Sequence, residues 1–576
     1  MSEHKLSLSC APLTGTRHTR SPALPARRTL RAWLNWRPQV STESLLLGVS
    51  LYLTLVFNTP FWRALLAGRS AQDGTFTYVL AVGVALTALH FVLLAPLLNR
   101  WTTKALLGAL ILIAAIASHY AGQYGVYFDP DMLRNVVRTD SAEARELLTP
   151  GFFIHLLVLA LPPLLVLQRA QLRRRRASRA FMVRTACSVL ALVVALAALG
   201  SVFKDFSGEM RQHKEIRYLI TPAAALWSLA RVLTHDVSAA NTPRRAIGTD
   251  AQLGASWQTA HKPMLFVITV GETARAANWG LSQSAAERAV HDTTPELARH
   301  EVINFPDVSS CGTNTEVSLP CMFSVQGRRH YDEDAIQNSE SLLNVLQHAG
   351  LRVVWNDNQS GCKGVCTGLE TIRPDPAALP ALCTDGHCLD EALVERSRSL
   401  LRDAQGNLVL VLHQLGNHGP SYFRRYPQTF RRFTPTCDDD DLSKCSREQI
   451  ANSYDNALAY TDHVVARTIE LLKEVEDRYD TALLYVSDHG ESLGENGIYL
   501  HGLPYSIAPA QQTQVPMVMW VSPGFAARNR LDLACLRRQA EQPTSHDALF
   551  HTVLGLVDVT TTIHEPALDI GGACRR

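Results

Sequence analysis

The segment 307–324 has the composition of a loop that presents a hydroxyl nucleophile. Within it, Thr313 and Thr315 follow a cysteine and a glycine, and a second cysteine comes ten positions after the first. Such a segment would hold one threonine rigidly on a tight turn. Because a threonine hydroxyl is a poor nucleophile at neutral pH, a base or a metal must activate it.

Three side chains that follow apolar runs could supply a metal site. Glu272 ends one run, and Asp488 and His489 together end another. With the Thr315 hydroxyl they form a set of oxygen and nitrogen ligands that suits zinc. An Asp-His pair after a strand is by itself as often a turn and a cap as a ligand pair. The prediction of a zinc ion therefore depends on all four residues having suitable types and lying at equivalent positions of the fold. Whether a second ion binds is not decided by the sequence.

Three histidines and a lysine are further candidates for contact with a substrate. His418 and His501 stand beside glycines, which let the backbone approach a ligand closely. Either could bind a phosphoryl group, protonate a leaving alkoxide or complete a second metal site, although a lone histidine in a loop is more often structural. His413 is the last residue of a strand candidate. Lys363 could offer its charge to a phosphate, and the alternative is an ordinary surface lysine.

The elements that must position these residues alternate between short apolar runs and helical spacing. Such alternation predicts a mostly parallel sheet that is covered by helices on both faces. Ligands in such sheets bind at the carboxyl ends of the strands, where the candidate residues fall. The expected strands are 264–271, 351–355, 408–413, 482–487 and 515–521, and the expected helices are 339–349, 390–402 and 452–477.

Before this region, five long stretches without formal charge are rich in Leu, Val and Ala. Each can cross a hydrocarbon core about 30 Å thick as a helix of roughly 20 residues. The sequence therefore predicts five transmembrane helices. They lie between Glu43 and Arg63, Asp73 and Arg100, Lys104 and Asp129, Glu146 and Arg169, and Arg184 and Lys204.

The distribution of Lys and Arg predicts a cytoplasmic N-terminus. With that start, the inside segments carry sixteen Lys and Arg residues and the short outside loops carry five, and positive loops stay in the cytoplasm. Five crossings then place everything after Lys204 outside. The arginine run 173–176 could instead bind nucleic acid, but beside two spans the topological interpretation is favoured. The net charge is only +2, and no nucleic-acid partner is expected. No cleavable signal peptide is evident.

Cysteine usage independently indicates an oxidising compartment for the part after the last span. Eight of the twelve cysteines form four close pairs there. In an oxidising compartment these pairs would become disulfides. The disulfides would pin irregular loops near the site. Zinc clusters usually show tighter pairs, so disulfides are favoured over metal ligation. Cys10 and Cys187 are expected to be free thiols, and the state of Cys535 and Cys574 is open. The expected disulfides are Cys311 with Cys321, Cys362 with Cys366, Cys383 with Cys388, and Cys437 with Cys445.

Composition also suggests how the chain is divided. The outside loop 129–150 is either a short helix at the membrane surface or a simple connector. The stretch 205–233 is typical of an interfacial helix, and 234–263 is typical of a linker. The predicted segments are a cytoplasmic tail (1–40), a transmembrane domain (41–205), an interfacial helix and linker (206–262) and a catalytic domain (263–576).

Taken together, these motifs closely resemble the phosphoethanolamine transferases of Gram-negative inner membranes. The similarity is greatest to the lipid A branch, which includes the mobile colistin-resistance enzymes, and it covers nearly the whole chain. The motifs that carry it are Gly271-Glu272-Thr273, Ser310-Cys311-Gly312-Thr313-Asn314-Thr315, Pro320-Cys321-Met322-Phe323-Ser324, 357–363, Asn417-His418-Gly419-Pro420, Ser453-Tyr454-Asp455-Asn456, Ser487-Asp488-His489-Gly490-Glu491 and Leu500-His501-Gly502.

The resemblance implies a fold and a set of roles. It implies five membrane helices followed by a periplasmic α/β/α domain of the alkaline phosphatase and sulfatase type. It implies that Thr315 becomes modified by phosphoethanolamine, that His418 and His501 contact the phosphoryl group or a second zinc, and that Thr313 and Lys363 lie near the substrate. It also implies that the zinc partners of Thr315 are Glu272, Asp488 and His489. Glu316 departs from the small apolar residue that is usual after this threonine.

The activity that the resemblance implies is a two-step transfer of phosphoethanolamine from phosphatidylethanolamine to a phosphate of lipid A. Masking lipid phosphate with an amine should weaken the binding of cationic antimicrobial peptides such as polymyxin and colistin. A monomer in the bacterial inner membrane is expected. The alternatives are transfer to core-oligosaccharide sugars, glycerol-phosphate transfer, ester hydrolysis, or a non-catalytic membrane scaffold with the same fold.

Overall fold

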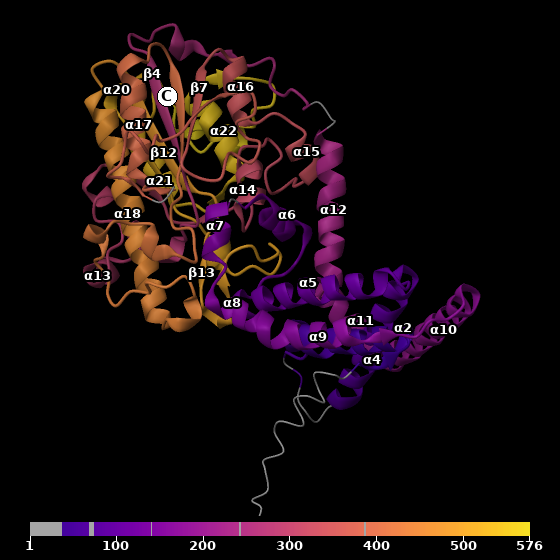
Figure 1. Ribbon diagram of the computed structural model, residues 1–576. Coiled ribbons are helices and arrows are strands. Elements are labelled where there is room, and N and C mark those ends of the chain that lie inside the picture. The colour runs from indigo at the N-terminus through magenta and orange to yellow at the C-terminus, as the bar shows by residue number, and fades with distance from the viewer. Residues whose placement is uncertain are drawn as a thin grey trace, which may run out of the picture.

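The structure is a computed structural model that describes residues 37–67, 69, 74–139, 141–240, 244–384 and 387–575. A group of apolar helices and an α/β domain are joined by a long helix, α12 (Ala223–Ala240) (Figure 1). Cys10 and the predicted tail up to residue 36 lie outside the described residues.

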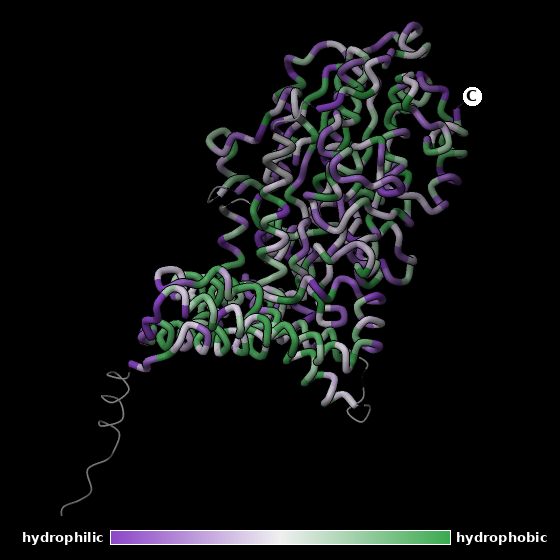
Figure 2. Tube along the Cα trace, turned by 90° about the vertical axis from the view of Figure 1, so that its right-hand side faces the viewer, coloured by the Kyte–Doolittle hydropathy of each residue, from purple (hydrophilic) through white to green (hydrophobic). Residues whose placement is uncertain are grey.

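In the described part of the chain, four helices are long and apolar enough to cross a membrane, and a bent pair provides a fifth candidate. Hydrophobic residues predominate throughout this group of helices (Figure 2). These helices agree with the five predicted spans. They are the bent pair Thr42–Phe57 and Thr59–Leu65, then Thr75–Leu97, which contains α4 (Thr75–Leu94), then α5 (Thr102–Tyr124), then Pro150–Arg169, which contains α8 (Pro150–His155) and α9 (Leu161–Arg169), and finally α10 (Ala177–Ser201).

The first candidate span is broken at Asn58, where its two halves meet at 59°. The Asn58 side-chain amide donates to the carbonyl oxygens of Leu53 and Thr221, each at 2.8 Å. Backbone groups freed by a break must find partners, because the hydrocarbon core offers no water. Pro60, in the first turn of the second half, has no N–H to continue the hydrogen bonds of the first half.

Two pairs of helices connect the membrane helices with the α/β domain. The outside loop forms α6 (Pro130–Arg138) and α7 (Ser141–Glu146), so the helical alternative for this loop is correct. The stretch predicted as one interfacial helix forms α11 (Phe203–Gln212) and α12, and α12 continues to Ala240, into the predicted linker. Figure 1 shows α6 and α7 at the base of the α/β domain.

The α/β domain is built on a seven-stranded sheet in the order β5-β15-β12-β4-β11-β7-β8. The strands from β12 to β8 are mutually parallel, and β15 and β5 add an antiparallel edge. The predicted mostly parallel sheet is therefore confirmed. The strands are β4 (Met264–Gly271), β5 (Ile303–Phe305), β7 (Arg352–Asp357), β8 (Glu370–Ile372), β11 (Leu408–His413), β12 (Asp480–Ser487) and β15 (Met517–Val521).

Helices cover both faces of this sheet because its central strands are apolar on both sides. Every residue of β4 is buried, and its alternate side chains enter two different cores, one with Phe266 and Ile268 and the other with Leu265 and Val267. Alternation of this kind is what a strand buried on both faces requires. The main helices are α14 (Thr315–Met322), α16 (Leu342–His348), α17 (Glu391–Asp403), α18 (Arg447–Glu474) and α22 (Asp547–Leu556).

Five disulfides link cysteines of the α/β domain. All four expected pairs form, and the structure adds Cys535–Cys574, which the sequence left open. Cys187, on the membrane helix α10, is a free thiol as expected. The restriction of disulfides to the part after the last span is what a domain outside the cytoplasm would show. The confirmed pairs are Cys311–Cys321, Cys362–Cys366, Cys383–Cys388 and Cys437–Cys445.

The disulfide of Cys445 fastens the loop that leads into α18. Cys445 is half-buried and stands two residues before that helix begins. Within the closed loop, Asp440 accepts from the Ser421 hydroxyl at 2.7 Å, and Asp441 accepts from the amide of Gln123, on α5, at 3.4 Å. The disulfide closes this short loop as expected, and the loop also contacts a membrane helix. Cys445 therefore stabilises a loop through which the α/β domain contacts the membrane helix α5.

Candidate metal centre and active site

The candidate metal centre forms where β4 and β12 end side by side. These parallel strands pair Gly271 with Ser487, so the residues that follow them emerge together. Glu272, Asp488 and His489 each offer a ligand atom, and these atoms lie within 4.8 Å of one another. All three side chains are fully buried. The structure thus brings the predicted metal ligands to one point at the carboxyl edge of the sheet.

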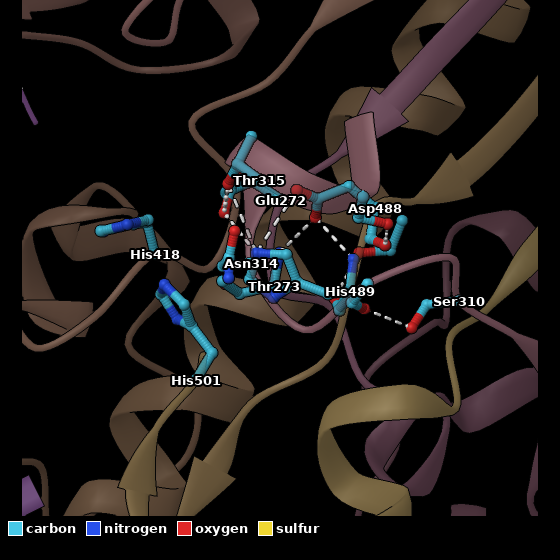
Figure 3. Close-up of polar contacts among 12 residues, drawn as sticks. Glu272, Thr273, Ser310, Asn314, Thr315, His418, Asp488, His489 and His501 are labelled. Atoms are coloured by element: carbon cyan, nitrogen blue, oxygen red, sulfur yellow. Dashed lines mark hydrogen bonds and ion pairs between the residues drawn. The ribbon is translucent and has the colours of Figure 1, made fainter. Parts of the chain in front are cut away.

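Thr315 faces this centre from the first turn of α14. Its Oγ1 donates to Glu272 at 3.0 Å and lies 3.3 Å from His489 Nε2. Asn314 caps the helix by accepting from the Val317 N–H, which fixes the helix end that carries the hydroxyl. Figure 3 shows Thr315 directly beside Glu272 and His489. The four predicted residues are therefore together.

The electrostatics of the centre fit a bound cation. Burial and the charge of Glu272 raise the pKa of Asp488 to about 7. Burial alone would raise the pKa of Glu272, but the hydrogen bond and charge of His489 bring it below its ordinary value. Asp488 Oδ2 is buried and has no hydrogen-bond partner among the described residues. Two buried carboxylates, one with an unsatisfied oxygen, and an imidazole are a set that a divalent cation would satisfy.

Three residues in or next to the candidate site motifs have strained backbone conformations. Thr273, Lys363 and Leu500 have φ values of 54°, 47° and 62°, in the left-handed region that side chains with a Cβ rarely adopt. Thr273 follows Glu272, and Leu500 precedes His501. Such strain persists only where the surrounding structure enforces it, and it is common at functional sites.

His418 lies beside the centre and pairs with a residue of the outside loop. Its Nε2 is 2.8 Å from the carboxylate of Glu143, on α7. Burial opposes protonation of His418, but the charge and hydrogen bond of Glu143 raise its pKa to about 10. His418 is therefore a cation at neutral pH, and a helix between two membrane spans supplies its counter-charge.

His501 lies next to His418 and is oriented by Glu491. The two imidazole rings have centroids 5.2 Å apart, and Figure 3 shows them together on one side of Thr315. His501 Nδ1 is 2.7 Å from Glu491, which also accepts from the Tyr422 hydroxyl at 2.6 Å. Burial lowers the pKa of His501. The two predicted histidines thus share one side of the site but differ in protonation.

Lys363 is close to the centre and is almost fully buried. Its Nζ forms an ion pair of 2.9 Å with Glu316, the residue after Thr315, and donates to Ser360 at 2.8 Å. Arg138, at the end of α6, lies 3.0 Å from the other carboxylate oxygen of Glu316. The alternative of an ordinary surface lysine is excluded by this burial. Glu316, which departs from the family pattern, is a buried carboxylate shared by two cations.

The remaining two candidates have structural partners. The Thr313 hydroxyl donates to the Leu503 carbonyl at 2.6 Å, so it holds the loop that carries His501. His413 is fully buried at the end of β11, with Nδ1 2.8 Å from Asp357. Contact of Thr313 and His413 with a substrate stays a prediction.

Three residues of the site were not predicted from the sequence. Glu143 and Glu491 position the two histidines, and the Gln359 amide donates to Glu272 at 3.0 Å. Gln359 and Glu491 lie inside motifs that carried the family resemblance, which was the available signal. Glu143 had none, because nothing in an acidic outside loop shows which distant histidine it meets.

Comparison with known proteins agrees with this geometry. The model of the sulfatase family matches residues 265–559, and the model described as phosphoethanolamine transferase EptA/EptB matches residues 86–237. Phosphoethanolamine transferase EptA of Escherichia coli K12 is 37% identical over 545 residues, covering 94% of this chain and 98% of that protein. Phosphatidylethanolamine transferase Mcr-1 of Escherichia coli is 33% identical over 537 residues, covering 91% of this chain and 96% of that protein.

A solved structure extends the similarity to the whole architecture. The integral membrane protein lipooligosaccharide phosphoethanolamine transferase A (EptA) from Neisseria meningitidis is 35% identical, with a TM-score of 0.87, and the match covers 94% of this chain and all of that one. The membrane helices, the sulfatase-type domain and the connection between them are therefore shared. This chain, a multi-pass membrane protein with a C-terminal soluble domain, belongs to the phosphoethanolamine transferase family.

Proposed function

We propose that this enzyme transfers phosphoethanolamine from phosphatidylethanolamine to a phosphate of lipid A through a covalent intermediate on Thr315. The observation that carries the proposal is the position of the Thr315 hydroxyl, 3.0 Å from Glu272 inside the candidate metal centre. A Kdo(2)-lipid A phosphoethanolamine 7''-transferase of Escherichia coli is only 26% identical, against 37% for EptA. The chain is therefore less similar to the enzyme whose name specifies a position on Kdo(2)-lipid A.

Zinc is the metal that best fits the centre, and Glu272, Asp488, His489 and Thr315 would hold it. When bound, zinc would favour the alkoxide form of Thr315 and polarise a phosphoryl oxygen. The buried carboxylates are compatible with one ion. His418 and His501 are the residues that a second ion would require, but the ion pair of His418 with Glu143 supports a role in proton transfer instead.

In the first half-reaction, deprotonated Thr315 Oγ1 forms a bond to the phosphorus of phosphatidylethanolamine, and the bond from phosphorus to the glycerol oxygen breaks. His418 donates a proton to the departing oxygen, which leaves as diacylglycerol. Glu143 keeps His418 protonated for this step. In the second half-reaction, a phosphate oxygen of lipid A forms a bond to the same phosphorus, and the bond from phosphorus to Thr315 Oγ1 breaks. Thr315 Oγ1 is left in the deprotonated form that begins the next cycle, and His418 regains its proton from solvent.

The membrane placement follows from the nature of both substrates. Donor and acceptor are lipids, so a site held at the bilayer surface raises their effective concentration. We place the catalytic domain (263–576) in the periplasm and the tail (1–40) in the cytoplasm, with the transmembrane domain (41–205) in the inner membrane and residues 206–262 as the connection. Five disulfides and the excess of Lys and Arg in the inside loops support this orientation. The enzyme would act as a monomer.

Mass spectrometry of both the protein and the lipid tests the proposal. Incubation with phosphatidylethanolamine should add the mass of one phosphoethanolamine group to the protein, and lipid A from cells that express it should gain the same group. A Thr315→Ala variant should lose both. The scaffold alternative predicts that this variant and the parent behave alike, and the core-sugar alternative predicts modified core with unmodified lipid A.

A further inference from the structure

A cavity of about 500 Å³ borders the nucleophile loop and is lined by three cationic side chains from three distant parts of the chain. Arg138 ends α6, Arg244 stands in the linker after α12, and Lys363 lies in the loop after β7. We propose that this cavity binds a phosphate group of the acceptor lipid, an inference that rests on the transferase function proposed above. Neither Arg138 nor Arg244 appeared among the predicted site residues.

The cavity is connected to the catalytic centre at two points. Glu316, one of its lining residues, directly follows Thr315 in α14. Ser360, another lining residue, directly follows Gln359, whose amide donates to Glu272 at 3.0 Å. The cavity is therefore lined by the residue next to the nucleophile and by the residue next to Gln359, which contacts a candidate metal ligand.

Glu316 holds two of the cations in place before any ligand binds. Its carboxylate, which is fully buried, receives Lys363 Nζ at 2.9 Å and Arg138 Nη1 at 3.0 Å. Long cationic side chains lose rotamer freedom when they bind a ligand, and fixing them beforehand reduces that loss. Among the described residues that line the cavity, three are cations and one, Glu316, is a carboxylate. The excess charge is what an anionic ligand requires.

Arg244 is held at the cavity by a backbone carbonyl and not by a carboxylate of the described residues. Its Nη1 donates to the Gly364 carbonyl at 2.7 Å, which fixes the guanidinium at the cavity. Within the described ranges, no carboxylate forms an ion pair with Arg244. Partial burial lowers the pKa of Arg244, and the charge of Glu340 opposes this effect only in part, as expected for a half-buried cation without a close counter-charge. A phosphate could accept hydrogen bonds from this guanidinium in two places at once.

The charge of the cavity favours the acceptor over the donor. The phosphodiester of phosphatidylethanolamine carries one negative charge, and its own ammonium would be repelled by three cations. A phosphate monoester of the acceptor carries up to two negative charges and no ammonium. His418, the proposed proton donor to the leaving group of the donor, does not line the cavity. The two substrates would therefore use different walls of the site.

Separating the two half-reactions tests this assignment. Full-length Arg138→Ala and Arg244→Ala variants are first loaded with phosphoethanolamine from phosphatidylethanolamine, and the loading rate is followed by intact-protein mass. Lipid A in detergent micelles is then added, and loss of the adduct is followed. We expect loading within about twofold of the parent, and transfer at low lipid A reduced about tenfold through a higher KM. Arg244→Lys should recover part of the loss.

Arg245→Ala is the matched control, because Arg245 is the next residue of the same linker, is exposed and does not line the cavity. It should load and transfer like the parent. Equal loss of loading and transfer in the Arg138 and Arg244 variants would assign the cavity to the donor and overturn the inference. So would normal transfer in both variants. A parent enzyme that never loads would instead refute the transferase function, and the inference with it.

Discussion

Glu143 of the outside loop and His418 of the catalytic domain form an ion pair of 2.8 Å between a carboxylate oxygen and Nε2. The helix that carries Glu143 is part of the membrane domain, so the catalytic centre is completed by a segment that precedes the fourth span. A residue that sets the protonation of the proposed acid therefore comes from outside the sulfatase-type domain.

Removing the charge of Glu143 should narrow the pH range of activity. Glu143 raises the pKa of His418 to about 10, and His418 must be protonated to act as an acid. In a Glu143→Gln variant this pKa falls, so the alkaline limb of the pH profile should move to lower pH by about 1 to 3 units. Initial rates of phosphoethanolamine transfer between about pH 6 and 10 measure the shift.

Glu448→Gln serves as the control for this profile, since Glu448 is an exposed residue in the first turn of α18. Its profile should match that of the parent. An unshifted alkaline limb in the Glu143 variant would show that His418 is not the group that titrates.

Removal of divalent metal should lower stability as well as activity. Without a cation, the carboxylates of Glu272 and Asp488 are buried together, and the repulsion destabilises the fold. We expect chelation to abolish transfer, to lower the melting temperature by several degrees, and to be reversed by zinc. An Asp488→Asn variant should be inactive, yet its melting temperature should hardly respond to the chelator. Strong stabilisation of that variant by zinc would contradict this ligand set.

A second ion pair holds the outside loop to the catalytic domain. Glu146 and Arg425 are both buried, with 2.6 Å between their charged groups, and Arg425 also donates to the His418 carbonyl at 2.7 Å. Breaking a buried pair leaves one uncompensated charge, so Glu146→Ala should lower the free energy of unfolding by about 3–5 kcal/mol. Denaturant titration in detergent measures it.

The double variant Glu146→Leu/Arg425→Met separates stability from function at this pair. Replacing both charges with apolar groups should recover much of the stability. Transfer activity should nevertheless stay below that of the parent, because the hydrogen bond from Arg425 to the His418 carbonyl is lost. Full recovery of activity would show that the pair acts only through stability.

Two disulfides should differ in what their removal affects. Cys535 and Cys574 are 39 residues apart in sequence, so replacing both with serine should lower stability by about 2–4 kcal/mol while activity persists at low temperature. Cys362 and Cys366 close a short loop around Lys363. Their replacement should reduce transfer with little change in the melting temperature, because Lys363 would leave its left-handed conformation. Thermal melting and transfer rates distinguish the two outcomes.

The strands and the metal centre could be predicted because their signals are local. β4 and β11 begin and end where the apolar runs 264–271 and 408–413 begin and end. Parallel strands bring the residues after their carboxyl ends together, so the meeting of Glu272 with Asp488 followed from the chain pattern alone. The sequence predicted the site residues whose positions follow from the end of a single strand or from a single motif.

Contacts between distant segments could not be predicted in the same way. Nothing in residues 141–146 shows that Glu143 meets His418, since the approach of α7 to the site depends on how the membrane helices pack. The antiparallel direction of β15 was also hidden, because a short apolar run has the same appearance in either direction. The disulfide of Cys445 was predicted from its spacing, but the contact of its loop with α5 was not. The pairing of Glu316 with Arg138 likewise depends on how the outside loop docks.

The contribution of Glu143, on α7, to the site has a practical consequence for inhibitor discovery. Compounds selected against the excised soluble domain meet a binding site without Glu143, in which His418 has lost its counter-charge and holds its proton less tightly. A ligand designed to pair with neutral His418 would then fail against the intact enzyme. Screening belongs on the full-length protein in a lipid environment.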